Sequence, residues 1–256
     1  MELSTLNDYI GHGRVLTVYR GSIAHGTFIP PEKEMSTDDI DLMTIVIPNS
    51  KYYIGLESWG SRGTIEVKKD SWDIVAYEFR KFLALLEQGN PNVLSTLWVS
   101  NQHVLEIRQA GEVIRRNRDL FVGKHVARTF GGYAYAQLQK MTQGEPSGRG
   151  YMGARRKELR LKFGYDTKNA AHLIRLLRMG IEFLNTGVLN VNRVNIDAME
   201  LIEIKQGKYT LEHINSLAKD LFEKMREAER NSVLPERPNH LKISALCEEL
   251  IWEELS

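Results

Sequence analysis

The chain has 256 residues, of which 42% are hydrophobic and 26% charged, the balance of an ordinary globular protein. Its 34 lysines and arginines against 33 aspartates and glutamates give a formal charge of +1, which excludes a protein that coats nucleic acid by bulk charge. The lone Cys247 excludes a disulfide framework and a cysteine-based zinc module. It favours a reducing compartment, so we expect a cytoplasmic protein. No apolar run approaches the ~18 residues of a membrane span, and we expect no membrane contact.

The first 100 residues contain short apolar runs, rich in Val, Ile, Thr and aromatic residues, separated by turn-forming residues. This pattern of short apolar runs and turn-forming residues is typical of strands. We expect strands over Val15–Tyr19, Ile40–Ile47, Thr64–Val67 and Trp72–Tyr77.

After Tyr77 the apolar residues follow helical spacing. Phe79, Phe82, Leu83 and Leu86 fall at i, i+3, i+4 and i+7, which predicts one face of a helix. A second helix is predicted over 91–98, because a proline suits its first turn. Later helices are expected at Leu105–Arg116, His125–Met141, Arg155–Thr186 with a break near Phe163-Gly164, Leu211–Asn231 and Ile243–Glu254. The four tryptophans are expected in the core: Trp59, Trp72, Trp98 and Trp252.

The order of these elements predicts an α+β fold. A small mixed β-sheet with helices is expected in a domain of residues 1–110, and a mostly α-helical domain in residues 111–256. Charge is uneven within the neutral total. Between Arg149 and Arg178 there are nine lysines and arginines against two acidic residues, whereas from Leu211 onward there are six against ten.

The most informative segment is Arg20–Ile47, which holds Asp39-Ile40-Asp41 at the start of an apolar strand. Side chains at i and i+2 of a strand point to one face, so the two aspartates project together. Two carboxylates this close repel each other unless a cation lies between them. Hard oxygen ligands favour Mg²⁺ or Mn²⁺, and a pair of such ions is what a two-metal phosphoryl transfer needs.

Gly21-Ser22 precedes this strand and predicts a phosphate contact. Glycine lets the backbone approach a phosphate, and the Ser22 hydroxyl can donate to a phosphate oxygen. A third carboxylate should come from a neighbouring strand. Asp73 is the preferred candidate, because it is polar inside an apolar run, with Glu66 and Asp70 as alternatives.

A helix in the basic segment carries a second candidate group. Lys168, His172 and Arg175 fall at i, i+4 and i+7, on one face of the predicted helix. Three potential cations in line could bind a triphosphate or an RNA backbone. The alternative is an ordinary solvated face.

The ordered set of Gly-Ser, Asp-x-Asp and a later carboxylate resembles the nucleotidyltransferase superfamily that includes DNA polymerase β. It is most similar to a bacterial and phage branch of predicted nucleotidyltransferases associated with RNA repair. The similarity continues through EFRKFLALLEQGNPNVLSTLW (residues 78–98) and YDTKNAAHLIRLLRMGIEFLNTG (residues 165–187). One departure is the loop Phe28–Thr37, which is longer and more charged than the linker expected there.

The resemblance implies roles for individual residues. Gly21 and Ser22 would contact the nucleotide phosphates, and Lys168 and His172 would lie on an active-site helix. The implied metal ligands are Asp39, Asp41 and Asp73.

The resulting hypothesis is a metal-dependent nucleotidyltransferase. It would transfer a nucleotide from an NTP to an acceptor hydroxyl on RNA or tRNA and release pyrophosphate. One rival is a degenerate nucleotidyltransferase fold that binds RNA or a protein, as in a toxin–antitoxin pair. A weaker rival is a glycosyltransferase that uses Asp-x-Asp. The preferred base, the acceptor and the oligomeric state stay open.

Overall fold

The structure is a computed structural model. It describes residues 3–30, 38–142 and 154–256, with the backbone alone at 3–4 and 154–157. The chain divides into two compact units. The first consists of Met1–Ala24, Asp39–Gly123 and Pro235–Ser256, and the second of His25–Asp38 and Lys124–Leu234. The sequence suggested a single domain boundary near residue 110. In the structure the first unit also includes residues 111–123 and 235–256, which lie beyond that boundary.

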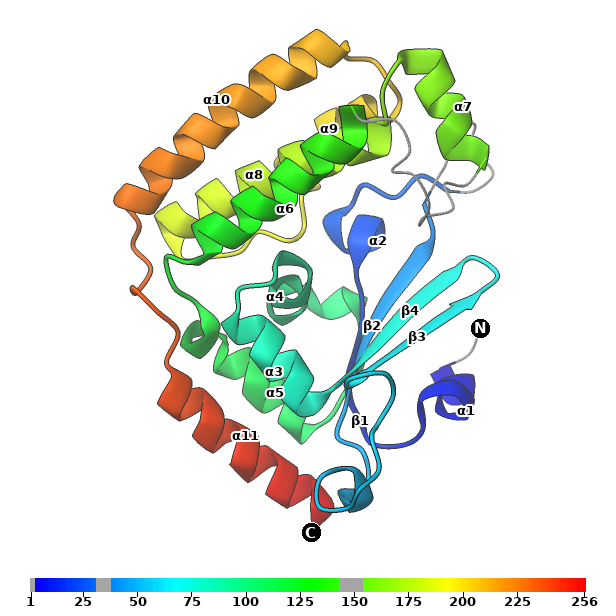
Figure 1. The fold of residues 1–256 in the computed structure, drawn as a ribbon, viewed down its shortest axis with the longest axis vertical. Coiled ribbons are helices and arrows are strands. Elements are labelled where there is room, and N and C mark those ends of the chain that lie inside the picture. Colours follow the sequence, from blue (N-terminus) through cyan, green and yellow to red (C-terminus); the bar gives the residue numbers. More distant parts are fainter. Residues whose placement is uncertain (1–2, 31–37, 143–153) are drawn as a thin grey trace. The chain divides into compact units, whose positions relative to one another are not determined.

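The first unit is built on one mixed sheet, part of which is labelled in Figure 1. Its strands lie in the order β3-β4-β2-β1-β5. The pair β2–β4 is parallel and the other neighbours are antiparallel. The strands are β1 (Arg14–Tyr19), β2 (Ile40–Val46), β3 (Thr64–Lys69), β4 (Trp72–Glu78) and β5 (Val104–Ile107). The four strands expected from the sequence are confirmed, each to within two residues at either end.

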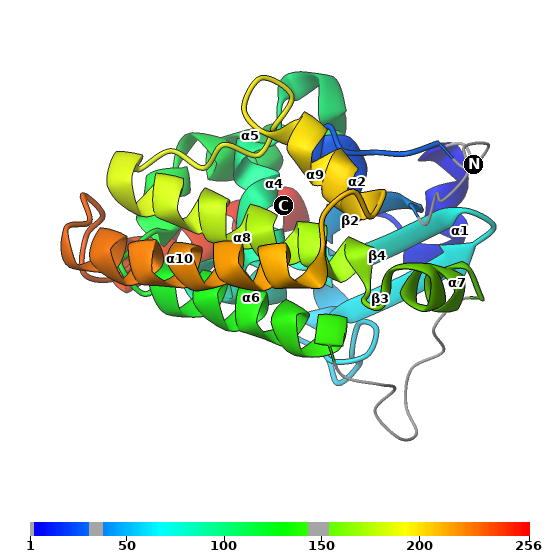
Figure 2. The same ribbon diagram turned by 90° about the horizontal axis from the view of Figure 1, so that it is seen from above.

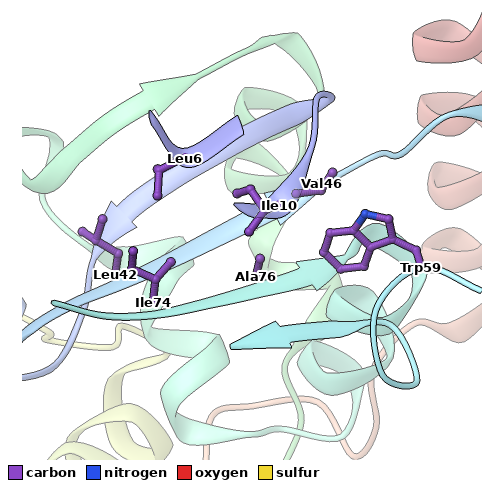
Figure 3. Close-up of a cluster of buried hydrophobic side chains, with 7 residues drawn as sticks. All are labelled: Leu6, Ile10, Leu42, Val46, Trp59, Ile74 and Ala76. Atoms are coloured by element: carbon purple, nitrogen blue, oxygen red, sulfur yellow. The ribbon is translucent and has the colours of Figure 1, made fainter. Parts of the chain in front are cut away.

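One face of this sheet is closed by the N-terminal segment (Figure 3). Leu6 and Ile10, at the start and end of a segment that includes helix α1 (Asn7–Ile10), are almost fully buried. They belong to one cluster with alternate residues of the central strands, which point to the same face because strand side chains alternate. The other members of the cluster are Leu42, Val46, Trp59, Ile74 and Ala76.

Helices α3 (Phe79–Glu87) and α4 (Pro91–Trp98) follow β4, as the sequence predicts. The Glu78 carboxylate caps α3 by accepting from the N–H groups of Arg80 and Lys81. The Asn90 side chain caps α4 in the same way, and Pro91 occupies its first turn. These local signals fix both helix starts independently of the rest of the fold.

The expected helix Leu105–Arg116 is wrong at its start. Residues 104–107 form β5, which pairs with β1, and only Gln109–Arg116 is helical, as α5. The apolar residues of 104–107 fit the spacing of a helix as well as that of a strand. The segment forms a strand because it pairs with β1 at the edge of the sheet. Helix α11 (His240–Leu255) belongs to the first unit and packs against α3, where His240 Nδ1 lies 2.8 Å from Glu87 Oε1.

The second unit is helical, and α6 (Val126–Thr142), α8 (Thr167–Thr186) and α10 (Leu211–Arg230) lie side by side in it (Figure 2). The Asp166 side chain caps α8 by accepting from Asn169 N–H, and Gly187 ends it in the left-handed region. The expected break in the helical run is confirmed, since α7 (Ala154–Phe163) ends just before Gly164. Helix α9 (Ala198–Lys205) was not expected from the sequence.

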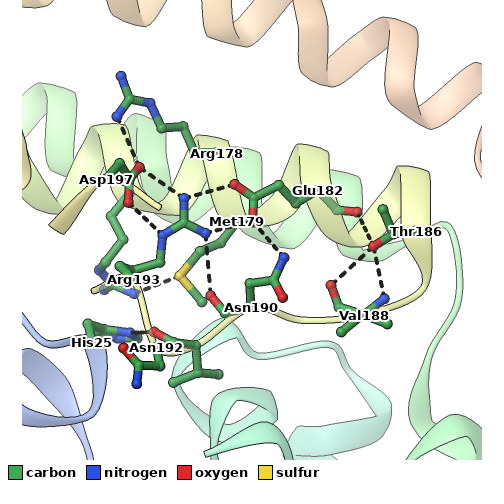
Figure 4. A network of polar contacts seen from close by, with 12 residues as sticks. His25, Arg178, Met179, Glu182, Thr186, Val188, Asn190, Asn192, Arg193 and Asp197 are labelled. Atoms are coloured by element: carbon green, nitrogen blue, oxygen red, sulfur yellow. Dashed lines mark hydrogen bonds and ion pairs between the residues drawn. The ribbon is translucent and has the colours of Figure 1, made fainter. Parts of the chain in front are cut away.

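A buried ionic network joins α8 to the chain that leads into α9 (Figure 4). The Arg193 side chain is fully buried and pairs with Glu182 of α8 and with Asp197. Arg178 of α8 pairs with Asp197 and with Glu200. Because a buried charge is tolerated only when it is paired, this network fixes the segment between α8 and α9.

The α+β class predicted from the sequence is confirmed, with a mixed sheet and helices followed by a mainly helical region. None of the helices that the structure describes combines the length and the apolar character needed to cross a lipid bilayer.

Candidate functional site

Asp41 and Asp73 lie side by side at one end of the sheet. Strands β2 and β4 are parallel here, and Asp41 is in register with Asp73. Neighbouring strands are about 4.8 Å apart, so the two side chains rise together from the same face. The sequence-based expectation that a neighbouring strand would bring a carboxylate to Asp41 therefore agrees with the register of this sheet.

Two cations contact this carboxylate pair, Arg20 from just after β1 and Lys68 from β3. Arg20 Nη2 lies 3.6 Å from Asp41 Oδ1 and 3.4 Å from Asp73 Oδ1. Lys68 of β3 is in register with Asp73 of β4, and its Nζ lies 3.4 Å from Asp73 Oδ2. About a quarter of each side chain of Arg20, Asp41 and Asp73 is exposed, so these charges are open to solvent. The guanidinium offsets the repulsion between the two carboxylates.

Gly21 places the start of helix α2 (Gly21–His25) against Asp41. Its φ is +61°, in the left-handed region that glycine tolerates best, and a Cβ at this position would collide with the Asp41 carboxylate. The backbone before it is held by the Arg20 N–H, which donates to the Asp41 carbonyl oxygen at 2.9 Å. Gly21 therefore packs against one member of the carboxylate pair, and the half-buried Ser22 follows it as the second residue of α2.

Asp39 is exposed and precedes β2, which begins at Ile40, so it lies outside the regular alternation of the strand. Among the described residues, no three His, Cys, Asp or Glu side chains are grouped closely enough to hold a metal ion. The structure thus joins Asp41 and Asp73 and does not assemble the three-carboxylate set. Two convergent carboxylates still fit a Mg²⁺ ion, which proteins bind through one or two carboxylates together with water and substrate phosphates.

The second unit carries the other predicted group on α8. Lys168, His172 and Arg175 are all helical and share one face, as their spacing predicts. Among the described residues, His172 Nε2 is buried without a hydrogen-bond partner. Burial lowers the pKa of His172 well below its ordinary value, and the charges of Arg175 and Lys168 lower it further. The imidazole is therefore neutral at neutral pH and has a buried nitrogen with unused hydrogen-bonding capacity.

Arg175 is the other unusual member of this face. Its Nη1 lies 3.2 Å from the Met179 sulfur, and no carboxylate of the described residues forms an ion pair with it. Burial, together with the charge of Arg193, lowers the pKa of Arg175 to about 9, against a smaller opposing effect of Asp197. An arginine in this state gains stability from any anion that approaches it.

A buried anion, Asp38, lies against the same face. Its carboxylate accepts from Lys205 Nζ at 2.8 and 3.1 Å, and Lys168 Nζ lies 3.3 Å away. Burial alone would raise the pKa of the Asp38 carboxyl, but the two lysines lower it below its ordinary value. Sequence analysis missed Asp38 and Lys205. The signal available was weak: an acidic residue just before Asp-x-Asp, and one lysine among many.

His25 is buried in the second unit and has a defined tautomer. Its Nδ1 lies 2.9 Å from the Val191 carbonyl oxygen, an acceptor, so Nδ1 carries the proton. Burial and the nearby Arg175 lower the pKa of His25 well below its ordinary value. The backbone N–H of Arg193 donates to the His25 carbonyl oxygen at 3.1 Å, which connects His25 to the network of Figure 4.

Comparisons with known proteins give one clear family match. The model of a family described as "RNA repair pathway DNA polymerase beta family" matches residues 1–250. No curated protein matches the chain. A crystal structure of a nucleotidyltransferase-like protein from Exiguobacterium sibiricum 255-15 is 9% identical, covering 98% of this chain and 77% of that one, with a TM-score of 0.28. This likeness is too distant to say anything about chemistry.

Proposed function

Since the chain belongs to the RNA repair pathway DNA polymerase beta family, we propose that it is a metal-dependent nucleotidyltransferase that transfers a nucleotide from an NTP to a hydroxyl of RNA or tRNA. The observation that carries the proposal is the register of Asp41 with Asp73, with Gly21 packed against Asp41. A binding module gains nothing from two adjacent carboxylates at the end of two inner strands of an apolar sheet, whereas phosphoryl transfer needs them.

In the proposed reaction Asp41 and Asp73 hold Mg²⁺ or Mn²⁺, with Asp39 as a candidate third ligand. The bound metal would neutralise phosphate charge and favour the ionised form of the acceptor hydroxyl. Without a side chain, the Gly21 backbone can lie directly against the Asp41 carboxylate, and in the proposed complex the Ser22 hydroxyl donates to a phosphate oxygen.

The remaining residues act by positioning and by charge. Arg20 holds the two carboxylates together, because its Nη2 donates to Asp73 Oδ1 at 3.4 Å and forms an ion pair with Asp41. In the proposed complex the same guanidinium shifts toward a phosphate oxygen. Lys168, His172 and Arg175 bind the triphosphate, and the neutral His172 donates or accepts a hydrogen bond there. Such positioning and charge neutralisation provide most of the catalysis in phosphoryl transfer. We place the protein in the cytoplasm, where its single cysteine would stay reduced.

The experiment is incubation with labelled NTPs, Mg²⁺ or Mn²⁺ and pooled tRNA. Label transfer should fall about 100-fold or more in Asp41→Asn and in Asp73→Asn, since each removes a charged metal ligand. Asp70→Asn is the matched control. Asp70 has a φ of +54° in the β3–β4 turn, a conformation that asparagine accepts, so transfer should be unchanged.

The same assay separates the rival functions. Turnover of a nucleotide sugar in place of label transfer would identify a glycosyltransferase. Tight RNA or protein binding without transfer, equal in the wild type and in the Asp41→Asn/Asp73→Asn double variant, would identify a binding module. Asp39→Asn decides whether Asp39 joins the other two carboxylates in catalysis.

A further inference from the structure

The carboxylate of Asp38 is held from several sides within the second unit. Its side chain is 1% exposed, and Oδ2 accepts from the Ile29 N–H at 3.0 Å. Lys205, at the end of α9, donates to both carboxylate oxygens and also to the Thr27 carbonyl oxygen at 2.8 Å. The three N–H bonds of Lys205 are thereby all engaged, so neither Lys205 nor Asp38 can move without losing several charge-assisted hydrogen bonds.

Lys168 differs from Lys205 in how it meets this carboxylate. Its Nζ lies 3.3 Å from Asp38 Oδ1, a longer contact than those of Lys205, and a third of its side chain is exposed, against 10% for Lys205. Asp38 is therefore a fixed anion with a buried cation on one side and a more accessible cation on the other.

Two ammonium groups share the Asp38 carboxylate. Lys205 makes the shorter and more buried contact, and Lys168 is the one that solvent and solutes can reach. Arg175, without a carboxylate partner among the described residues, and the buried His172 Nε2 add further anion-binding capacity on the same helix face.

We propose that Asp38 is a positioning residue that aims the Lys168 ammonium at a phosphate group, with Lys205 as the buried counterion that keeps Asp38 in place. The identity of the phosphate as part of an NTP rests on the proposed function. The positioning itself requires only that this face of α8 binds a polyphosphate anion.

A different role for Asp38 makes the opposite prediction. If Asp38 occupied the place of a substrate phosphate, its removal would relieve repulsion and strengthen anion binding. The four hydrogen bonds that hold Asp38 and Lys205 argue against such displacement. The sign of the change in affinity therefore distinguishes a positioning residue from a competing anion.

The test is isothermal titration of the full chain with inorganic tripolyphosphate at low ionic strength without divalent metal. Lys168→Met should weaken binding about tenfold, the effect of losing one charge-assisted contact. Asp38→Asn should weaken it by a similar factor. In the Lys168→Met background, Asp38→Asn should cause no further change, because it acts through Lys168. Lys208→Met is the matched control, since Lys208 is exposed and forms a surface ion pair with Glu203.

Asp38→Asn leaves Lys205 buried and unpaired, which can unfold the unit. Asp38→Asn/Lys205→Met removes both buried charges and should show the same loss of affinity in a folded protein, as judged by circular dichroism. Tighter tripolyphosphate binding in either variant would overturn the proposal. The proposal would also be overturned if Asp38→Asn lowered the affinity as much in the Lys168→Met variant as in the wild type. A tripolyphosphate affinity that Lys168→Met does not change would overturn it as well.

These results are separable from the fate of the proposed function. Tripolyphosphate binding needs neither metal nor transfer, so the positioning role can hold in a protein that transfers no label. Conversely, full label transfer together with unchanged tripolyphosphate binding in Asp38→Asn would reject the positioning role alone.

Discussion

Asp41 and Asp73 are paired in register on parallel strands, and a single nitrogen of Arg20 lies within 3.6 Å of both carboxylates. A guanidinium here occupies the position between two anions that a divalent cation would also favour. The arginine thus offsets the charge of the pair in the protein without metal, and its removal should make the pair more dependent on added cations.

The variant Arg20→Met tests whether a divalent cation can take over the role of the Arg20 guanidinium between the two carboxylates. The variant should be less stable than the wild type by about 1 kcal/mol, because two carboxylates lose a shared partner. Mg²⁺ at ten times its dissociation constant should then restore about 1.4 kcal/mol, measured as a rise in the midpoint of thermal unfolding. Lys68→Met removes a cation that pairs with Asp73 and, among the described residues, does not bridge to Asp41; it is the control and should respond less to the same concentration of Mg²⁺. An identical Mg²⁺ response in the two variants would refute the bridging role of Arg20.

Gly21→Ala should destabilise the first unit through two effects. A positive φ costs a non-glycine residue about 1 kcal/mol, and the added Cβ would displace the Asp41 carboxylate for a further cost of about 1–3 kcal/mol. Gly187→Ala isolates the first effect, because Gly187 is in the left-handed region with a φ of +73° and an added Cβ would meet only ordinary contacts at 3.9 Å. Urea unfolding of both variants measures the difference. Equal losses would show that Asp41 does not pack against Gly21.

The buried His25 predicts a pH dependence of stability. Its pKa is depressed in the folded state, so the unfolded chain binds more protons below the ordinary histidine pKa of about 6.5, and folding becomes less favourable as pH falls. The free energy of unfolding should decrease between pH 7 and pH 5, by up to about 1.4 kcal/mol per pH unit from this residue. His25→Asn, whose amide can still donate to the Val191 carbonyl oxygen, should flatten that slope, whereas the exposed His12→Asn should not. The measurement is urea unfolding at pH 5, 6 and 7, and a slope unchanged in His25→Asn would contradict the assignment.

Arg193 and Arg178 predict unequal effects in the ionic network of Figure 4. Arg193→Met removes a fully buried guanidinium that pairs with Glu182 and Asp197 and should cost about 3 kcal/mol or more, since both carboxylates lose a buried partner. Arg178→Met removes a more exposed partner of Asp197 and should cost about 1 kcal/mol. Chemical unfolding compares the two, and a larger loss in Arg178→Met would show that burial does not govern this network.

The sequence predicted the features that depend on neighbouring residues. Helices α3 and α4 are set by their capping residues and by apolar spacing, and the break before Gly164 by a local signal. The pairing of Asp41 with Asp73 was also expected, because Asp73 is an acidic residue inside an otherwise apolar strand and so stood out as the carboxylate that would join Asp41.

Features that depend on distant contacts were missed. Lys205 meets Asp38 across 167 positions of the chain, and no local pattern marks that pair. Arg20 ends a strand, and only the register of three strands places its side chain between two carboxylates. Trp252 was expected in the core but is 69% exposed, because the apolar residues of α11 do not all turn toward α3.

The order in which the two units occur along the chain has a consequence for biosynthesis. The first unit includes both the strands at the beginning and α11 at residues 240–255, with nearly the whole second unit translated between them. Residues 1–24 therefore leave the ribosome early, yet their unit is finished only after α11 has emerged. A nascent chain halted before residue 240 would expose the surface of α3 that α11 covers, which makes stalled or truncated products the ones most in need of chaperones.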